Sequence, residues 1–184
     1  QTVGRCALCE GTFAKRAMTK HVQACLAAHA ATAPAKSAKK PAFHLVVEGR
    51  YAPEYWLHLQ VRADATLERL DGFLRHIWLE CCGHMSAFNI AGQRYAVAPM
   101  AEMDDLPMDR TLGRLLTSGM QFGYEYDFGS TTELGLKVVS EHLVAGKTKP
   151  VELLARNDPP PITCAVCGKP AQVVCTECAY DVSA

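Results

Sequence analysis

Four side chains of the kinds that bind metals lie close together near the start of the chain. Cys6 and Cys9 are separated by two residues, and His21 and Cys25 by three, in the pattern C-x2-C-x11-H-x3-C. A C-x2-C turn brings two thiolates to one side, and residues i and i+4 of a helix share a face. Zinc prefers four thiolate or imidazole ligands in a tetrahedron. The spacing therefore predicts a zinc site.

This stretch resembles the three-Cys-one-His zinc fingers of the form C-x2-C-x3-F-x4-L-x2-H-x3-C. Phe13 stands at the aromatic position, and Met18 replaces the usual leucine. Fingers of this kind bind nucleic acids or proteins, so the resemblance leaves both kinds of partner open. Polar residues on or before the expected helix are the candidate contacts with such a partner. They are Lys15, Arg16, Lys20 and Gln23.

A second set of cysteines lies near the other end of the chain. Cys164, Cys167, Cys175 and Cys178 follow the pattern C-x2-C-x7-C-x2-C. Four thiolates close one structural zinc site and leave no position for a reactive water. Cross-braced modules such as B-boxes begin with the same spacing and use the second pair for another ion, so that pair could also be incomplete. The two ligand sets together predict two zinc ions.

Composition and charge restrict the compartment and the partners. Seven of the nine cysteines fall in metal-ligand patterns, and no secretory segment is recognisable at the start, so we expect a reducing cytoplasm. No apolar run approaches the ~20 residues of a membrane span. Residues 1–42 hold seven basic groups and one acid, a net +6, so the rest of this neutral chain carries −6. That basic arm would attract phosphates, or would be a solvated tail.

The residues between the two cysteine sets predict an α+β domain. Residues 66–80 have apolar side chains at helical spacing, which indicates an amphipathic helix capped by Asp64 or Thr66. Residues 110–119 predict a shorter helix that ends at Gly119. Alternating segments predict a mixed or antiparallel sheet packed on these two main helices. The expected strands are 43–49, 55–64, 86–92, 93–98, 121–128 and 132–144.

The same patterns divide the chain into four parts. An α+β domain is flanked by two small zinc-binding modules, with an Ala-, Lys- and Pro-rich stretch after the first. The expected parts are a zinc finger at 1–26, a helix tail and linker at 27–42, the α+β domain at 43–150, and a four-cysteine zinc module at 151–184.

Several separated motifs of the central region resemble one family. They read YWLHLQVRADATLERLDGFLRHIW, GHMSAFNIAGQRYAV, LGRLLTSGMQFGYEYDFGSTTELGLKVV and LLARNDPP. In this order they resemble the plasmid ORF-three-like family, also called TnpR-like insertion-sequence passenger proteins, over residues 43–160. The resemblance implies an α+β domain of two β-rich halves around a helix, in a mobile-element setting. It implies no biochemical activity, and no nucleophile amid arginines surrounds Ser86, Ser118 or Ser130.

A possible pocket follows from the same resemblance. Members commonly carry Y-D-F-G-D-x-W-x-H and H-L-H-x-F, whereas this chain reads YDFGSTTEL and HMSAF. His84, Tyr124 and Asp127 are the candidate pocket residues that remain, although a lone histidine near a strand is more often structural. The adjacent Cys81 and Cys82 are either a redox or metal site or buried apolar residues.

Three functions therefore stay open from the sequence. The preferred one is a non-enzymatic zinc-binding accessory protein that binds a protein or a nucleic acid. The second is a nucleic-acid-binding protein that uses its basic arm, whose affinity would fall steeply with salt. The third, a hydrolase or deaminase centred on His84 and Asp127, lacks the ligand spacing of a catalytic zinc site.

Overall fold

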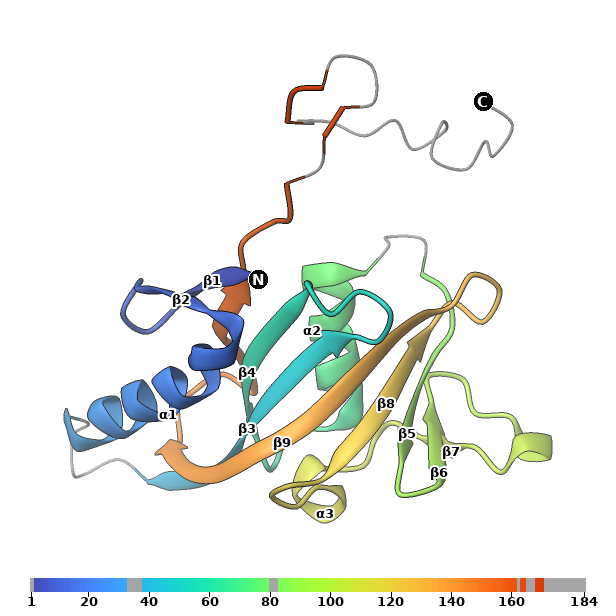
Figure 1. Ribbon diagram of the computed structural model, residues 1–184. Coiled ribbons are helices and arrows are strands. Elements are labelled where there is room, and N and C mark those ends of the chain that lie inside the picture. The colour runs from blue at the N-terminus through green and yellow to red at the C-terminus, as the bar shows by residue number, and fades with distance from the viewer. Residues whose placement is uncertain (1, 33–37, 80–82, 162, 165–167, 171–184) are drawn as a thin grey trace.

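The computed structural model describes residues 2–32, 38–79, 83–161, 163–164 and 168–170. Within them, ten strands form one sheet in the order β2-β1-β10-β4-β3-β9-β8-β5-β6-β7 (Figure 1). Neighbouring strands are antiparallel except β6 and β7, which are parallel. Together with its helices, this mixed sheet confirms the predicted α+β class.

The elements follow one another along the chain as a series of hairpins and crossovers. The strands are β1 (Val3–Cys6), β2 (Thr12–Ala14), β3 (Lys39–Gly49), β4 (Trp56–Arg62), β5 (Ser86–Ile90), β6 (Gln93–Ala96), β7 (Leu106–Pro107), β8 (Gln121–Tyr126), β9 (Thr132–Ala145) and β10 (Val151–Asn157). The helices are α1 (Lys15–Thr32), α2 (Leu67–Trp78), α3 (Leu112–Leu115) and the short 3-10 helix η1 (Ala101–Met103).

The inner face of the sheet, behind it in Figure 1, carries α2 and the main core. Leu67, Leu70 and Leu74 project from α2 and are fully buried against alternate residues of the central strands. Thr66 caps this helix, because its hydroxyl accepts a hydrogen bond from the amide of Arg69 at 3.4 Å. The sheet side of the main core includes Phe43, Leu45, Val47, Leu57, Leu59, Val61, Phe88, Tyr124, Tyr126, Leu134, Leu136 and Val138.

In the described part of the chain, the helix that covers the outer face is α1, which packs at one end of the sheet against β10 and β4 (Figure 1). Met18 and Val22 of α1 meet Trp56 of β4 there, and all three side chains are fully buried. This second core is separate from the main core and much smaller. It consists of Cys6, Met18, Val22, Trp56, Leu154 and Ala155.

The sheet takes in segments at both expected domain boundaries. The stretch 27–42 includes the end of α1 and the start of β3, and residues 33–37 lie outside the described part. The stretch 151–184 begins with β10, which pairs with β4 on one side and with β1 on the other. The sequence pattern did not predict this interior strand, because the proline-rich stretch that follows it dominated the pattern.

A buried polar network joins α2 to the inner side of β5 and β8. The carboxylate of Asp71 is almost fully buried and accepts hydrogen bonds from Ser86 Oγ at 2.6 Å and from the Tyr124 hydroxyl at 2.7 Å. Arg75, one turn further along the helix, donates to the other oxygen at 2.8 Å. Burial, and then the neighbouring carboxylate, raise the pKa of Tyr124, so its hydroxyl stays a donor.

Candidate metal centre

The first ligand pair lies on a tight turn between β1 and β2. The amide of Cys6 donates to the carbonyl of Gly11 at 2.9 Å, and the amide of Glu10 donates back to the carbonyl of Cys6 at 2.9 Å. Glu10 adopts a left-handed conformation with φ of 61°, which lets the chain reverse within the turn. The turn therefore holds Cys6 and Cys9 on one side, as the C-x2-C spacing predicts.

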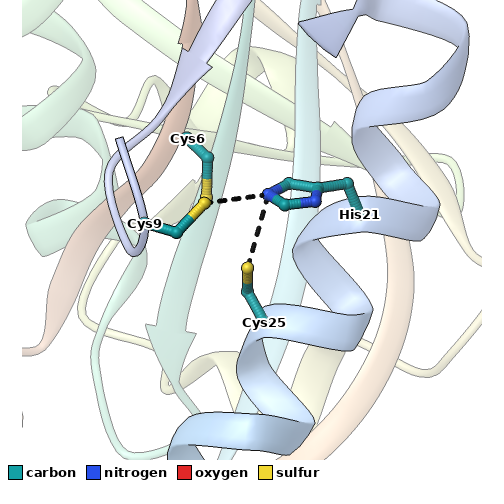
Figure 2. A group of neighbouring side chains, drawn as sticks. All are labelled: Cys6, Cys9, His21 and Cys25. Atoms are coloured by element: carbon teal, nitrogen blue, oxygen red, sulfur yellow. Dashed lines mark hydrogen bonds between the residues drawn. The ribbon is translucent and has the colours of Figure 1, made fainter. Parts of the chain in front are cut away.

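The second ligand pair comes from α1. His21 and Cys25 lie one turn apart on that helix, and both point toward the turn that carries Cys6 and Cys9 (Figure 2). His21 Nε2 lies 3.2 Å from Cys9 Sγ and 3.3 Å from Cys25 Sγ. The four possible ligand atoms all lie within 4.8 Å of one another. Tertiary structure thus brings together the four N-terminal residues that the sequence selects.

The donor set suits zinc. Three sulfurs and one imidazole nitrogen are the soft and borderline ligands of structural zinc sites. The ring of Phe13 stacks on the ring of His21 with centroids 3.6 Å apart, which fixes the imidazole plane beside the thiols. Phe13 and Met18 both pack on or in the second core, as expected from the finger pattern. Among the described residues, this is the one group of histidine, cysteine and acidic side chains with metal-site spacing.

The surroundings shift the pKa values of two of the thiols in opposite directions. The backbone N–H of Gly11 lowers the pKa of the exposed Cys9 thiol by hydrogen bonding. Burial, followed by the neighbouring Cys9, raises the pKa of Cys25 to about 11. A divalent cation reverses the second effect, because coordination removes the proton from a thiol outright. Metal binding at this centre would therefore release protons.

The centre is attached to the sheet through β1. The backbone of Gly4 lies so close to β10 that an added Cβ would stand 2.3 Å from the carbonyl oxygen of Arg156 and 2.5 Å from the Trp56 ring. The indole N–H of Trp56 donates to Thr2 Oγ1 at 3.1 Å. Only glycine permits this approach, so position 4 determines how tightly the metal-binding hairpin joins the sheet.

Of the C-terminal ligand set, Cys164 alone lies among the described residues. The amide of Cys164 donates to the carbonyl of Lys169 at 2.8 Å, and the amide of Gly168 donates to the carbonyl of Cys164 at 2.9 Å. Gly168 has φ of 68°. Cys167, Cys175 and Cys178 lie outside the described residues. The prediction of a second zinc site therefore stays a prediction.

The four candidate contact residues do not form one group. Arg16, Lys20 and Gln23 are exposed on α1, at positions that share a helix face. Lys15 instead points toward the sheet, where its ammonium donates to the carbonyl of Pro53 at 2.6 Å and lies 3.2 Å from the Glu48 carboxylate. Lys15 thus holds the start of α1 to the chain around Pro53, which the sequence did not indicate.

Two of the three candidate pocket residues lie near each other, and the third points elsewhere. His84 Nδ1 lies 3.8 Å from the Asp127 carboxylate, and the histidine side chain is 46% exposed. Tyr124 is fully buried and donates its hydroxyl to Asp71. None of the three lines the hollows in the described part of the chain. Cys81 and Cys82 lie outside the described residues.

Two hollows lie elsewhere on the surface. A groove of about 850 Å³ runs over the outer face of β3, β9 and β8 beside α1, where Gly123 and Gly135 are paired across two strands. A smaller hollow of about 340 Å³ lies at the end of α2 and is walled by Tyr51, Tyr55 and Trp78. The sequence pattern gave no signal for either hollow, because each is formed by segments distant along the chain.

Comparisons with known proteins agree with the fold. Residues 41–173 match the family described as Plasmid pRiA4b ORF-3-like protein, and the chain belongs to that family. The crystal structure of the protein of unknown function MM3350 from Methanosarcina mazei Go1 is similar at a TM-score of 0.58 and 15% identity, over 64% of this chain and 70% of that one. This likeness concerns the fold. No curated protein matches the chain.

The family match confirms the resemblance seen in the central motifs, and it extends past the boundary expected from the sequence. It begins at residue 41, within β3, and ends at residue 173, between Cys167 and Cys175. Cys6, Cys9, His21 and Cys25 lie outside the matched residues. None of the described helices has the length and apolar character needed to cross a bilayer.

Proposed function

We propose that the protein is a zinc-stabilised binding protein, in which Cys6, Cys9, His21 and Cys25 hold one structural zinc ion. The convergence of three sulfurs and one imidazole nitrogen within 4.8 Å carries this proposal. Four protein ligands complete a tetrahedron, so the ion would have no position for a substrate or a reactive water. Its role would then be to tie the β1–β2 hairpin to α1.

A second structural zinc ion, held by Cys164, Cys167, Cys175 and Cys178, belongs to the same proposal. Its support is a backbone turn shared by the two cysteine motifs. In each motif the first cysteine exchanges hydrogen bonds with the residues four and five positions later, and the residue four positions later has a positive φ. A turn of this kind holds two thiolates toward one ion.

Metal content distinguishes the two sites. We expect about two zinc ions per chain in the intact protein, one in Cys9→Ala/Cys25→Ala and one in Cys164→Ala/Cys178→Ala, by elemental analysis of folded protein. Cobalt substitution should show thiolate charge-transfer bands that weaken in each variant. The matched control is Cys81→Ala, which removes a cysteine outside both ligand sets. Full zinc content in either ligand variant would refute that site.

In this proposal the protein binds another protein or a nucleic acid, and it acts in association with a mobile genetic element. The family takes its name from a plasmid reading frame, which supports that association. The exposed stripe of Arg16, Lys20 and Gln23 on α1 favours a nucleic acid as one candidate, because two of its three members are cations without an ion-pair partner among the described residues.

Nucleic-acid binding through α1 predicts a measurable salt effect. The logarithm of the DNA affinity should fall linearly with the logarithm of salt concentration, and Arg16→Ala and Lys20→Ala should each reduce the slope by about 0.9. Fluorescence anisotropy with labelled duplex and single-stranded probes measures both slopes. Arg114→Ala removes an exposed cation from α3, which packs against the main core on the other face of the sheet, and should leave the slope unchanged. Absence of binding at low salt would direct the search to protein partners.

A further inference from the structure

Three histidines lie diagonally across the outer face of the sheet. His44 on β3 stands between His58 on β4 and His142 on β9, each displaced by two residues from direct register. His44 and His58 are 0% and 2% exposed, and His44 Nε2 lies 2.8 Å from His58 Nδ1. β3 and β4 thus share a hydrogen-bonded pair of buried imidazoles, His44 and His58, which we call the histidine pair.

In its neutral state the histidine pair holds two N–H protons, one on each ring, and one of them lies in the hydrogen bond between the rings. Between two imidazole nitrogens at hydrogen-bond distance, one must donate and the other must accept. The remaining nitrogen of His44, Nδ1, is buried and has no hydrogen-bond partner among the described residues, and the same holds for Nδ1 of His142. A third proton on the bridging nitrogens would set two N–H groups against each other, and a third proton on His44 Nδ1 would create a buried, charged N–H group with no acceptor among the described residues.

The charges around the histidine pair oppose protonation. From α1, the charge of Lys15 disfavours a proton on His58, although the Glu48 carboxylate of β3 lies 3.2 Å from that ammonium and offsets part of its charge. From β9, His142 disfavours a proton on His44. The nearest acid on β10, Glu152, accepts a hydrogen bond from Gln60 at 3.0 Å, and Gln60 Oε1 in turn lies 2.8 Å from His142 Nε2. Among the described residues, no carboxylate contacts either ring of the pair.

Burial is the main cause of the lowered pKa of His44, His58 and His142. It lowers the pKa of His44 to about 4 and that of His58 to about 3, with the neighbouring histidine as the second cause in each case. It also lowers the pKa of His142. The ordinary histidine value is 6.5, so an arrangement that exposes these rings binds more protons between pH 6.5 and about 4.

Few contacts hold the layer of residues that lies next to the histidine pair. The N-terminal layer, residues 2–32, contacts the sheet through the short β1–β10 pairing, Lys15 and the second core. His58 touches that second core, because its ring meets the edge of the Trp56 ring with centroids 5.6 Å apart. The main core lies on the opposite face and does not depend on these contacts. Local opening of such a layer costs less than global unfolding.

We propose that the histidine pair is a proton-operated latch, whose protonation in mild acid detaches the N-terminal layer from the sheet while the main core stays folded. The sign follows from linkage. The docked state binds fewer protons than the detached state below pH 6.5, so docking weakens as the pH falls through that value and is favoured above it. Acidification would then expose the outer face of β4 and β3.

The two tryptophans of the chain report on the two faces separately. Trp56 is fully buried in the second core, and its indole N–H donates to Thr2. Trp78 packs against the main core at the end of α2. In ¹⁵N-labelled, metal-loaded full chain, we expect the Trp56 indole signal to move in a reversible step between pH 6.5 and 4, while the Trp78 signal stays in place.

Isosteric variants test the cause of that step. Glutamine at position 44 can place its amide N–H near the site of Nε2, and asparagine at position 58 can place its carbonyl oxygen near the site of Nδ1. His44→Gln/His58→Asn can therefore keep a hydrogen bond but cannot gain a proton. We expect the Trp56 step to move down by about one pH unit or more in this variant. A ¹⁵N titration of the wild-type histidine rings gives the same answer if the variant fails to fold.

Two results would overturn the latch. One is a Trp56 step that coincides with metal release, measured with a chromogenic chelator, and keeps its midpoint in the double variant, since protonation of the metal ligands would then be the cause. The other is a wild-type titration in which the His44 and His58 rings stay neutral through the Trp56 step.

Discussion

Removing the metal from the N-terminal centre is expected to unfold residues 2–32 and to leave the main core intact. The reason is the small size of the second core, which holds six buried residues on the sheet and α1. Most of the stability of a helix in a protein comes from packing of its apolar face, which for α1 is the small second core, and β1 and β2 are short. Structural zinc contributes about 10–16 kcal/mol of apparent binding energy in finger peptides, enough to decide whether such a layer folds.

Hydrogen exchange followed by mass spectrometry measures this effect segment by segment. After chelation, or in His21→Ala, the amides of β1 and α1 should lose protection, whereas those of β3 and α2 should keep it. His21→Cys supplies a fourth thiolate and should restore metal binding and protection. His76→Ala removes an exposed histidine from α2 and is the matched control. Unchanged protection of α1 without metal would show that packing alone holds the layer.

Replacing Asp71 with alanine is expected to lower the free energy of unfolding by about 3–5 kcal/mol. This carboxylate is 4% exposed and is the shared acceptor for Ser86, Tyr124 and Arg75. Its removal leaves a part-buried guanidinium and two buried hydroxyls without their acceptor, and breaking a buried pair costs this much because the remaining charge is uncompensated.

Urea unfolding of a graded series checks the assignment. Asp71→Asn keeps one carbonyl oxygen and leaves no buried carboxylate, so it should cost less than the alanine variant. Arg75→Ala leaves the buried Asp71 carboxylate without its cation and should also be clearly destabilising, although the two hydroxyl donors remain. Glu68→Ala changes an exposed carboxylate in the first turn of the same helix and should cost under about 1 kcal/mol. A loss below about 1 kcal/mol for Asp71→Ala would mean that water replaces the network.

Several local features could be predicted because their determinants lie within a few residues of one another. The C-x2-C and H-x3-C spacings predicted which N-terminal side chains would converge, and the apolar period of residues 66–80 predicted α2 and its Thr66 cap. The predicted second helix proved shorter than 110–119. The amides of Leu112 and Gly113 donate to the carbonyls of Ala65 and Ala63, and the helix ends at Leu115.

Sequence patterns also misjudged the role of individual residues where distant segments meet. Tyr124 was expected beside His84 and Asp127, but an alternating strand pattern does not say which face a helix will cover. Because α2 covers that face, the Tyr124 hydroxyl meets Asp71 instead. The sequence pattern did not single out His44 and His58, since a histidine between two large apolar residues of a strand resembles an ordinary polar interruption. Their partnership depends on the β3–β4 register.

By itself, the sequence determined the chemistry of the candidate metal centre, the α+β class and the family, because ligand spacing, helical period and hairpin turns are local properties. Only the tertiary structure decided that β10 enters the sheet between β1 and β4 and that Lys15 anchors α1. It also decided that the imidazoles of His44 and His58 and the carboxylate of Asp71 are buried. These outcomes depend on pairing between residues far apart in the chain, where strand register and layer packing, rather than local preference, set which groups lose water.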